Sequence, residues 1–193
     1  AADALEKGAA YAVVDDPSLP NTRPDKADRL IVVDDALQTL QALAREHRRK
    51  LGLPILAITG SNGKTTTKEL VSRVLAERFE VYATRGNLNN HIGVPLTLLA
   101  MTRDTEFGVV EMGASACGEI ALLCAIAEPN FGLITNVGRA HLEGFGGVEG
   151  VRRGKGELYD YLAANGGRAF VRRDDGTLVK MAAERGNLAV EFY

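Results

Sequence analysis

A glycine-rich segment lies between a short apolar run and an amphipathic stretch. Residues 59–68 read TGSNGKTTTK, and they follow the apolar run 54–59. Glycines let the backbone approach an anion, and the N–H groups at a helix N-terminus attract it. Lys64 adds a full positive charge, and the Thr65 hydroxyl suits Mg²⁺. The segment predicts a nucleotide-phosphate loop that binds through Gly60, Ser61, Asn62, Gly63, Lys64, Thr65 and Thr66.

The spacing of this loop departs from the common form. The common phosphate loop has a glycine five residues before the glycine of Gly-Lys, and Ile58 stands there in this chain. A glycine-rich turn that only caps a helix is the alternative interpretation. The succession of strand, Gly-Lys-Thr and helix favours phosphate binding.

One carboxylate and one imidazole side chain are candidates for a metal site. Glu111 follows the apolar run 107–110 and therefore lies at the carboxyl end of a predicted strand, where α/β sheets bind ligands. Its carboxylate suits Mg²⁺, but a solvated turn residue fits the pattern equally well. His141 lies six residues after the strand signal 132–135. A lone histidine is more often structural, and imidazole is an unusual ligand for Mg²⁺.

Asparagines and one lysine complete the polar candidates. Asn87, Asn89 and Asn90 lie in the segment 86–95, where Gly-Asn is also a common turn pair. Lys155 lies in a helical pattern at 149–163. Solvation is the ordinary state of such a lysine, so the residues alone leave a structural role open for all four.

Alternating strands and helices must position these residues. Helical segments follow the glycine-rich loop and recur near 116–127 and 149–163. The strand signals between them lie at 54–59, 81–83, 107–110, 132–135 and 169–171. This alternation predicts an α/β fold with a mostly parallel sheet covered by helices.

The N-terminal part has a different pattern. Apolar runs at 11–14 and 30–33 flank a stretch of turn formers and predict two short strands. A helix follows, and its basic end is typical of a solvated last turn. We expect a small α/β remnant at 1–34, a linker helix at 35–52 and a nucleotide-binding domain at 53–193.

Composition and charge narrow the function classes. The 193 residues are 46% hydrophobic and 25% charged, which suits a packed core with a polar surface. A net charge of −2 gives no sign of a nucleic-acid or membrane-surface binder. No apolar run reaches the roughly 18 residues that a membrane span needs. Cys117 and Cys124 lie seven apart on a predicted helix and suggest core packing in a reducing cytoplasm.

Five segments in combination resemble one enzyme family. They are the short loop 59–68, GNLNNHIGVP at 86–95, VEMGA at 110–114, TNVGRAHLEGFG at 135–146 and GKGE at 154–157. With these segments the chain resembles the Mur ligase family. The resemblance implies that 1–34 is the end of a uridine-nucleotide-binding domain. It also implies that 53–193 is a central ATP-binding domain, incomplete at its C-terminal end.

The resemblance implies an ATP-dependent ligase that forms an amide bond in bacterial peptidoglycan precursors, in the cytoplasm. The implied substrates are UDP-N-acetylmuramoyl-tripeptide and D-alanyl-D-alanine, joined through an acyl phosphate. Mg²⁺ is the implied metal, and the implied state of Lys155 is a carbamate, which replaces a cation by two oxygen ligands. These 193 residues by themselves are expected not to catalyse ligation.

The resemblance also assigns roles to individual residues. The implied catalytic residues are Lys64, Asn89, His141 and Lys155. The implied metal ligands are Thr65, Glu111, His141 and Lys155, and Asn136 is an implied nucleotide contact. One departure is visible, because Arg172 stands where the family's adenine-side segment has asparagine.

Other functions stay open at this point. A different Mur ligase or a folylpolyglutamate synthetase has the same short loop, and the Asn-rich segment favours a Mur ligase. A nucleotide-binding module without ligase chemistry would need the loop alone. A phosphate-release assay with each substrate omitted in turn separates these three possibilities.

Overall fold

The computed structural model describes residues 1–138 and 141–193. The chain divides into two compact units, Ala1–Leu43 and Ala44–Tyr193. The division falls inside helix α3 (Ala36–Leu51), so this helix is shared between the units. The linker helix expected at 35–52 corresponds to this helix.

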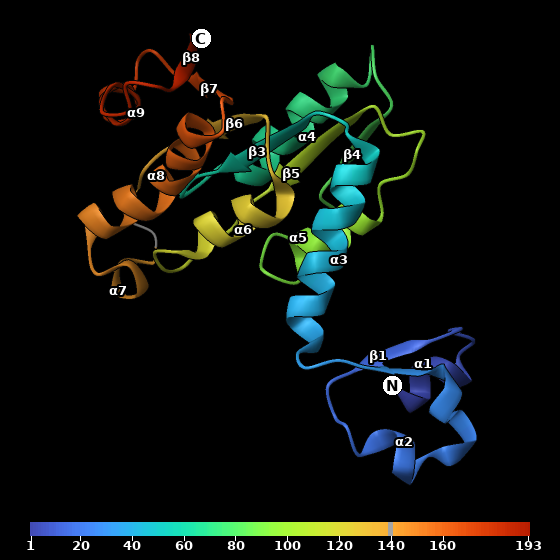
Figure 1. Cartoon of the computed structure of the whole chain (residues 1–193). Helices are drawn as coiled ribbons and strands as arrows, with labels where there is room; N and C mark the ends of the chain where they lie inside the picture. Colours follow the sequence, from blue (N-terminus) through green and yellow to red (C-terminus); the bar gives the residue numbers. More distant parts are fainter. Residues whose placement is uncertain (139–140) are drawn as a thin grey trace. The chain divides into compact units, whose positions relative to one another are not determined.

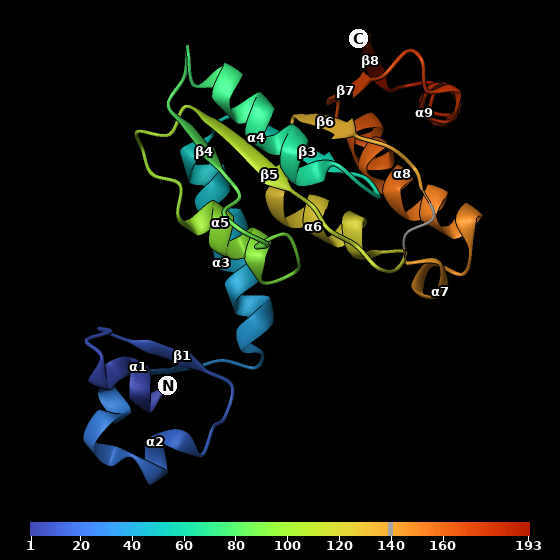
Figure 2. The same cartoon turned by 180° about the vertical axis from the view of Figure 1, so that it is seen from behind.

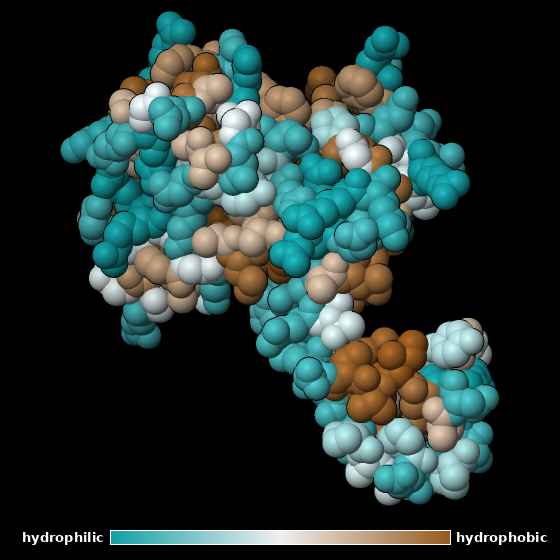
Figure 3. All heavy atoms as spheres, in the orientation of Figure 1, coloured by the Kyte–Doolittle hydropathy of each residue, from teal (hydrophilic) through white to brown (hydrophobic). Residues whose placement is uncertain are grey.

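The N-terminal unit is built on two short parallel strands. Strand β1 (Ala12–Val14) pairs with β2 (Leu30–Val32), as the two apolar runs predicted. The connecting chain forms α2 (Leu19–Thr22) and the 3₁₀ helix η1 (Pro24–Arg29), and α1 (Ala2–Glu6) precedes β1. Figure 3 shows apolar side chains gathered over this small sheet, where Val13, Ile31 and Val32 are exposed.

The second unit contains a six-stranded parallel sheet, which confirms the predicted fold class (Figures 1 and 2). Its order is β4-β5-β3-β6-β7-β8. The strands are β3 (Ile55–Thr59), β4 (Val81–Ala83), β5 (Phe107–Glu111), β6 (Phe131–Ile134), β7 (Arg168–Val171) and β8 (Ala189–Phe192). Strand β3 pairs with β5 on one side and with β6 on the other. The next two strands along the chain, β4 and β5, lie on one side of β3, and the later strands lie on the other side. A switch point of this kind opens a crevice beyond the carboxyl end of β3.

Helices cover the two faces of the sheet unequally. On one face lie α5 (Gly93–Leu99), α6 (Glu119–Ala127), α8 (Val148–Ala164) and α9 (Gly176–Ala183). Helix α4 (Lys64–Leu75) packs on the other face, as Figure 2 shows. Successive residues of β3 point to opposite faces, so Ile55 joins the first core and Leu56 the second.

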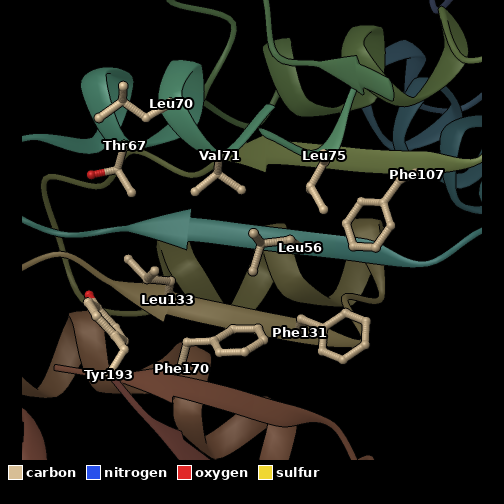
Figure 4. A pocket seen from close by; sticks show the side chains of 10 residues that line it. All are labelled: Leu56, Thr67, Leu70, Val71, Leu75, Phe107, Phe131, Leu133, Phe170 and Tyr193. Carbon is tan, nitrogen blue, oxygen red and sulfur yellow. The ribbon is translucent and has the colours of Figure 1, made fainter. Parts of the chain in front are cut away.

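The face that carries α4 has an apolar hollow of about 610 Å³ (Figure 4). Phe107 of β5, Phe131 of β6 and Phe170 of β7 form its floor, with successive ring centres 6.2 and 6.1 Å apart. Val71 and Leu75 of α4 close one side. Among the described residues, its lining consists of apolar side chains and the hydroxyls of Thr67 and Tyr193, without a carboxylate, an imidazole or an amine.

Several elements escaped the sequence analysis. Helices α5 and α9, the short α7 (Leu142–Phe145) and strand β8 were not expected. Cys117 lies before α6 and is exposed, so only Cys124 packs in the core as predicted.

The basic end of α3 was also misjudged. Arg48 is buried, and its guanidinium donates to the carbonyl oxygens of Ala127 and Glu128 and to Asn130 Oδ1, at 2.9 to 3.0 Å. The expected solvated last turn is therefore wrong at this residue. A buried cation bonded to the last carbonyls of α6 ties the two helices together.

Candidate active site

The predicted phosphate loop lies between β3 and α4, at the switch point of the sheet. Gly60 has a φ of +142°, and a Cβ at this position would lie 2.0 Å from Thr135 Oγ1. Gly63 has a φ of +79° at the N-cap of α4. These two positions require glycine, because the first lies against the next strand and both have a left-handed backbone.

Hydrogen bonds to the two residues that follow β6, Thr135 and Asn136, fix the position of the loop. Ser61 N donates to the carbonyl oxygen of Asn136, and Asn62 N donates to Asn136 Oδ1, both over 3.1 Å. The Asn62 carbonyl oxygen accepts from Thr135 Oγ1 at 2.6 Å and from Asn136 Nδ2 at 3.0 Å. The sequence analysis expected Asn136 to contact nucleotide, and the structure gives its side chain the task of bracing the loop. Thr135 was missed, although its place at the end of a strand is a signal.

Charge and free hydroxyls gather at the first turn of α4. Lys64 Nζ donates to the carbonyl oxygen of Gly60 over 2.9 Å, so its amine is folded back over the loop. Thr65 and Thr66 are exposed beside it. The first N–H groups of a helix have no partners within that helix. Backbone N–H donors, the Lys64 cation and two threonine hydroxyls therefore lie close together at this turn.

A polar cavity of about 570 Å³ opens next to this turn. Lys64, Asn89 and His141, three of the predicted catalytic residues, all line it. Glu119 and Ser115 line it as well, and Glu119 Oε2 accepts from Ser115 N over 2.6 Å. The cavity thus brings together side chains from loops that follow β3, β4, β5 and β6.

Glu111 is buried at the carboxyl end of β5, with 2% of its surface exposed. The alternative of a solvated turn residue is therefore wrong. Its Oε1 accepts from Asn89 Nδ2 over 2.8 Å, and its backbone N donates to Thr84 Oγ1 over 3.0 Å. Its Oε2 is buried and has no hydrogen-bond partner among the residues that the structure describes. A buried oxygen of this kind is costly unless a ligand meets it.

The asparagines of the segment 86–95 divide into two roles. Asn89 fixes the site, since its carbonyl oxygen accepts from Gly113 N over 2.8 Å and its amide reaches Glu111. Asn90 is a cap, because its Oδ1 accepts from the backbone N of Ile92 and Gly93. Asn87 is exposed in the turn before them.

Lys155 is also buried, with 2% of its surface exposed, so the solvated role is wrong here too. Its Nζ lies 3.3 Å from the Ala114 carbonyl oxygen and 5.2 Å from the centre of the Phe145 ring. Burial, and next the charge of Lys64, lower the pKa of this amine from 10.5 to about 8. The side chain therefore points toward the loop that follows Glu111 rather than toward water.

Two glycines in α8 leave space for Phe145, whose ring lies next to the Lys155 amine. A Cβ at Gly154 would lie 2.4 Å from Phe145 Cε1, and one at Gly150 would lie 1.7 Å from the Phe145 carbonyl oxygen. Glu157, one turn on, accepts from the backbone N of Gly118 at 2.5 Å and of Ala121 at 2.9 Å. This cap on α6 was missed by the sequence analysis, which used GKGE only as a family segment.

His141 lines the cavity and is exposed, with a left-handed φ of +54° at the start of α7. Arg139 and Ala140, which precede it in the segment 135–146, lie outside the described residues. Across 1–138 and 141–193, no three His, Cys, Asp or Glu side chains are grouped to hold a metal. The oxygens of Glu111 and Thr65 still fit Mg²⁺, a hard cation that completes its shell with phosphate and water.

Comparison with known proteins decides the family. The model of the Mur ligase middle domain matches residues 58–193. The chain belongs to the Mur ligase family. The matched range begins within β3, and so it includes the loop, the cavity, Glu111 and Lys155.

Mur ligases of one kind are prominent among the similar proteins. UDP-N-acetylmuramoyl-tripeptide–D-alanyl-D-alanine ligase of Bacillus subtilis is 47% identical over 163 residues, 84% of this chain and 35% of that protein. A crystal structure of MurF from Acinetobacter baumannii superposes with a TM-score of 0.87 at 33% identity, over 99% of this chain and 41% of that one. MurF ligase from Thermotoga maritima in complex with ADP gives 0.86 at 34% identity, over 99% and 43%. The chain spans about a third of the length of such curated relatives.

Arg172, where the sequence departs from the family's adenine-side segment, lies beside the start of α9. Arg172 pairs with Asp175 Oδ2 at 3.0 Å. Asp175 caps α9, since its Oδ1 accepts from the backbone N of Thr177 and Leu178. The segment 171–175 is thus organised around the start of α9. In addition, no helix within the described residues is long and apolar enough to cross a membrane.

Proposed function

We propose that this chain is the nucleotide-binding part of an ATP-dependent ligase of bacterial peptidoglycan synthesis, acting in the cytoplasm. The enzyme would join D-alanyl-D-alanine to UDP-N-acetylmuramoyl-tripeptide. The observation that carries the proposal is the polar cavity beside the loop, with Lys64 at its edge and an unpartnered Glu111 oxygen behind Asn89. The printed name of the Bacillus subtilis relative supports the choice of substrates.

The loop and the first turn of α4 would bind the phosphates of ATP. The N–H groups of the first turn of α4 would donate to an anion there, because they have no partners within the helix, whereas the loop N–H groups of Ser61 and Asn62 already donate to Asn136. The amine of Lys64, now bonded to the Gly60 carbonyl oxygen, would turn to the β- and γ-phosphates. Its charge stabilises the transferring phosphoryl group most in the transition state, which is where a contact accelerates the reaction.

Three residues would hold Mg²⁺: Thr65 through its hydroxyl, Glu111 through Oε2, and Lys155 in a carbamate form. When bound, the metal supplies positive charge that neutralises the phosphate oxygens. His141, the fourth implied metal ligand, would act from its place in the lining of the same cavity. Asn89 would orient the Glu111 carboxylate through the bond to Oε1.

The surroundings of Lys155 support the proposal of a carbamate at this position. An ammonium so close to a metal site would repel the cation, whereas a carbamate offers two oxygen ligands. The neutral amine attacks carbon dioxide, an N–C bond forms, and one proton leaves for water. Burial favours the neutral amine, because the charged form loses hydration.

The reaction itself proceeds in two steps. A carboxylate oxygen of the tripeptide attacks the γ-phosphorus of ATP, and ADP leaves with the electron pair of the broken P–O bond. The amino group of D-alanyl-D-alanine then attacks the acyl phosphate carbon through a tetrahedral intermediate. Phosphate leaves, the nitrogen loses a proton to water, and the amide bond is complete.

A phosphate-release assay on the full-length protein tests the proposal. We expect release from ATP and Mg²⁺ only when UDP-N-acetylmuramoyl-tripeptide and D-alanyl-D-alanine are both present, together with one amide product by mass spectrometry. Release with a folate and glutamate, or with a different amino acid in place of the dipeptide, would identify another ligase. Nucleotide binding without release under all conditions would identify a binding module.

The 193-residue chain serves as a second sample in this assay. It spans about a third of its curated relatives, and ligation requires both substrates to be held in attacking distance. Such positioning is worth roughly 7–11 kcal/mol in favourable cases. We expect nucleotide binding and no measurable ligation from the chain by itself.

A further inference from the structure

We propose that Lys68 is a positioning residue that fixes Glu111 for the metal, a role that rests on the proposed function. Lys68 lies in α4, and only 2% of it is exposed. Its Nζ donates to the carbonyl oxygen of Thr84 over 2.6 Å. None of the roles assigned above uses this buried cation.

Thr84 transmits this contact to the metal ligand. It directly follows β4 and extends the pairing with β5, since its backbone N donates to the Val109 carbonyl oxygen over 3.0 Å. Its side-chain Oγ1 accepts from the backbone N of Glu111, also over 3.0 Å. Lys68, Thr84 and Glu111 therefore form one continuous series of hydrogen bonds from α4 through β4 to β5.

An ammonium is an expensive group at this place unless it has a task. Burial removes its hydration, and an apolar side chain of the same length would fill the space without that cost. Lys68 has two acceptors, the Thr84 carbonyl oxygen and Glu69 Oε1 at 2.9 Å. Charge-assisted hydrogen bonds are stronger and more directional than dispersion contacts, so a lysine holds the backbone of residue 84 in one position.

The position of Lys68 on α4 connects the two halves of the metal site. Lys64 and Lys68 are four residues apart and lie on the same side of the helix. The first turn carries Lys64 and Thr65, and the next turn carries the bond to Thr84. The Lys68 bond therefore adds a polar connection between the helix that carries Thr65 and the strand end that carries Glu111, beside the apolar packing of α4 on the sheet. Without it, we expect the separation between the Thr65 hydroxyl and Glu111 Oε2 to vary more.

The test measures the metal directly in the full-length protein. Mn²⁺ replaces Mg²⁺, and its affinity is measured by electron paramagnetic resonance with a non-hydrolysable ATP analogue present. We expect Lys68→Met to weaken Mn²⁺ binding at least tenfold. Affinity for the analogue in the presence of a chelator should change less than twofold. Arg73→Met removes an exposed cation from the same helix and should change neither value.

Two further variants keep the outcome decisive. Thr84→Val retains the backbone carbonyl that accepts from Lys68 but removes the hydroxyl, and it should weaken Mn²⁺ binding to a similar degree. The double variant Lys68→Met/Glu111→Gln should bind Mn²⁺ no more weakly than Glu111→Gln, because both changes act on one ligand. If Lys68→Met does not fold, as judged by circular dichroism, Thr84→Val decides the matter.

The outcomes separate this proposal from the proposed function. Unchanged Mn²⁺ affinity in folded Lys68→Met or Thr84→Val, with a large loss in Glu111→Gln, would overturn the role of Lys68 alone. Unchanged affinity in Glu111→Gln would overturn the metal site itself. A role in stability only would lower the melting temperature of Lys68→Met and leave Mn²⁺ affinity of the folded protein unchanged, which also contradicts the proposal.

Discussion

The amino group of Lys155 lies over the ring of Phe145, 5.2 Å from its centre. The two residues belong to α8 and α7, and Gly154 of α8 lies against the edge of the same ring. The amine is thereby held away from water and aimed at the loop that follows Glu111. The burial of the amine against this ring is the basis for the reactivity with carbon dioxide that we expect of Lys155.

Replacement of Lys155 by alanine should lower the activity of the full-length protein by at least roughly 100-fold in kcat, because the proposed carbamate ligand of the metal would be lost. Addition of a short carboxylic acid such as acetate should restore part of the rate, since its oxygens can occupy the space of the missing carbamate. Phosphate release measures both effects. Lys180→Ala, an exposed lysine on α9, is the control and should behave as wild type. Full activity of folded Lys155→Ala would contradict the assigned role.

The amount of carbamate should depend on pH. Burial lowers the pKa of Lys155 to about 8, so the metal-free chain holds mainly ammonium below pH 8 and mainly neutral amine above it. At a fixed concentration of dissolved carbon dioxide, the amount of carbamate should increase between pH 7 and pH 9. The reason is that only the neutral amine reacts, and its fraction rises across this interval around the pKa. Carbon-13 NMR with labelled bicarbonate detects it. A spectrum at pH 9 identical to that of Lys155→Ala would rule the modification out.

The same pKa has a consequence for stability with a defined sign. The unfolded chain keeps the ordinary lysine pKa of 10.5, so between pH 8 and 10.5 it binds more protons than the folded chain. The contribution of this amine to the free energy of unfolding therefore rises with pH across that window, and it is flat below pH 8. Urea unfolding of the unmodified chain against Lys155→Met, at pH 7.5 and at pH 10, isolates the effect. A difference that does not change between the two values would show an unperturbed amine.

Lys64→Ala should weaken ATP binding by on the order of 10–100-fold, because a charge-assisted bond to phosphate is worth about 1.5–3 kcal/mol. A fluorescent ATP analogue titrated into the protein reports the affinity. Circular dichroism should be unchanged, since the bond to Gly60 is a surface contact of the loop. Arg73→Ala on the same helix provides the comparison, and equal affinities in the two variants would mean that general charge accounts for binding.

Gly150→Ala should destabilise the second unit. The added Cβ would lie 1.7 Å from the Phe145 carbonyl oxygen, and a backbone atom cannot move aside cheaply. Overpacking typically costs about 1–3 kcal/mol, which exceeds the gain of about 1 kcal/mol in helix propensity. Gly176→Ala is the matched control, because its Cβ meets nothing within 4 Å. Urea unfolding that shows equal stability for the two variants would place α7 differently from the structure described here.

Much of this architecture could be predicted from the sequence, because local patterns determine it. The apolar runs and glycines around residues 54–68 were sufficient for the strand, loop and helix, and Glu111 was correctly expected at a strand end. Secondary structure and turns depend on neighbours within a few positions, and the chain itself displays those neighbours. The combination of segments also identified the Mur ligase family.

The burial and partners of the charged side chains were decided only by the tertiary structure. The sequence predicted a solvated turn around Arg48 and assigned no role to Lys68, and both side chains prove to be buried donors to backbone carbonyls. Their acceptors lie 79 and 16 residues away, respectively. A side chain's solvation and pKa depend on which distant segments pack around it, and no local spacing contains that information. The sequence therefore determined the kinds of group at the site, whereas the packing of α4, α8 and the strand ends decided which oxygen, amine and amide face one another.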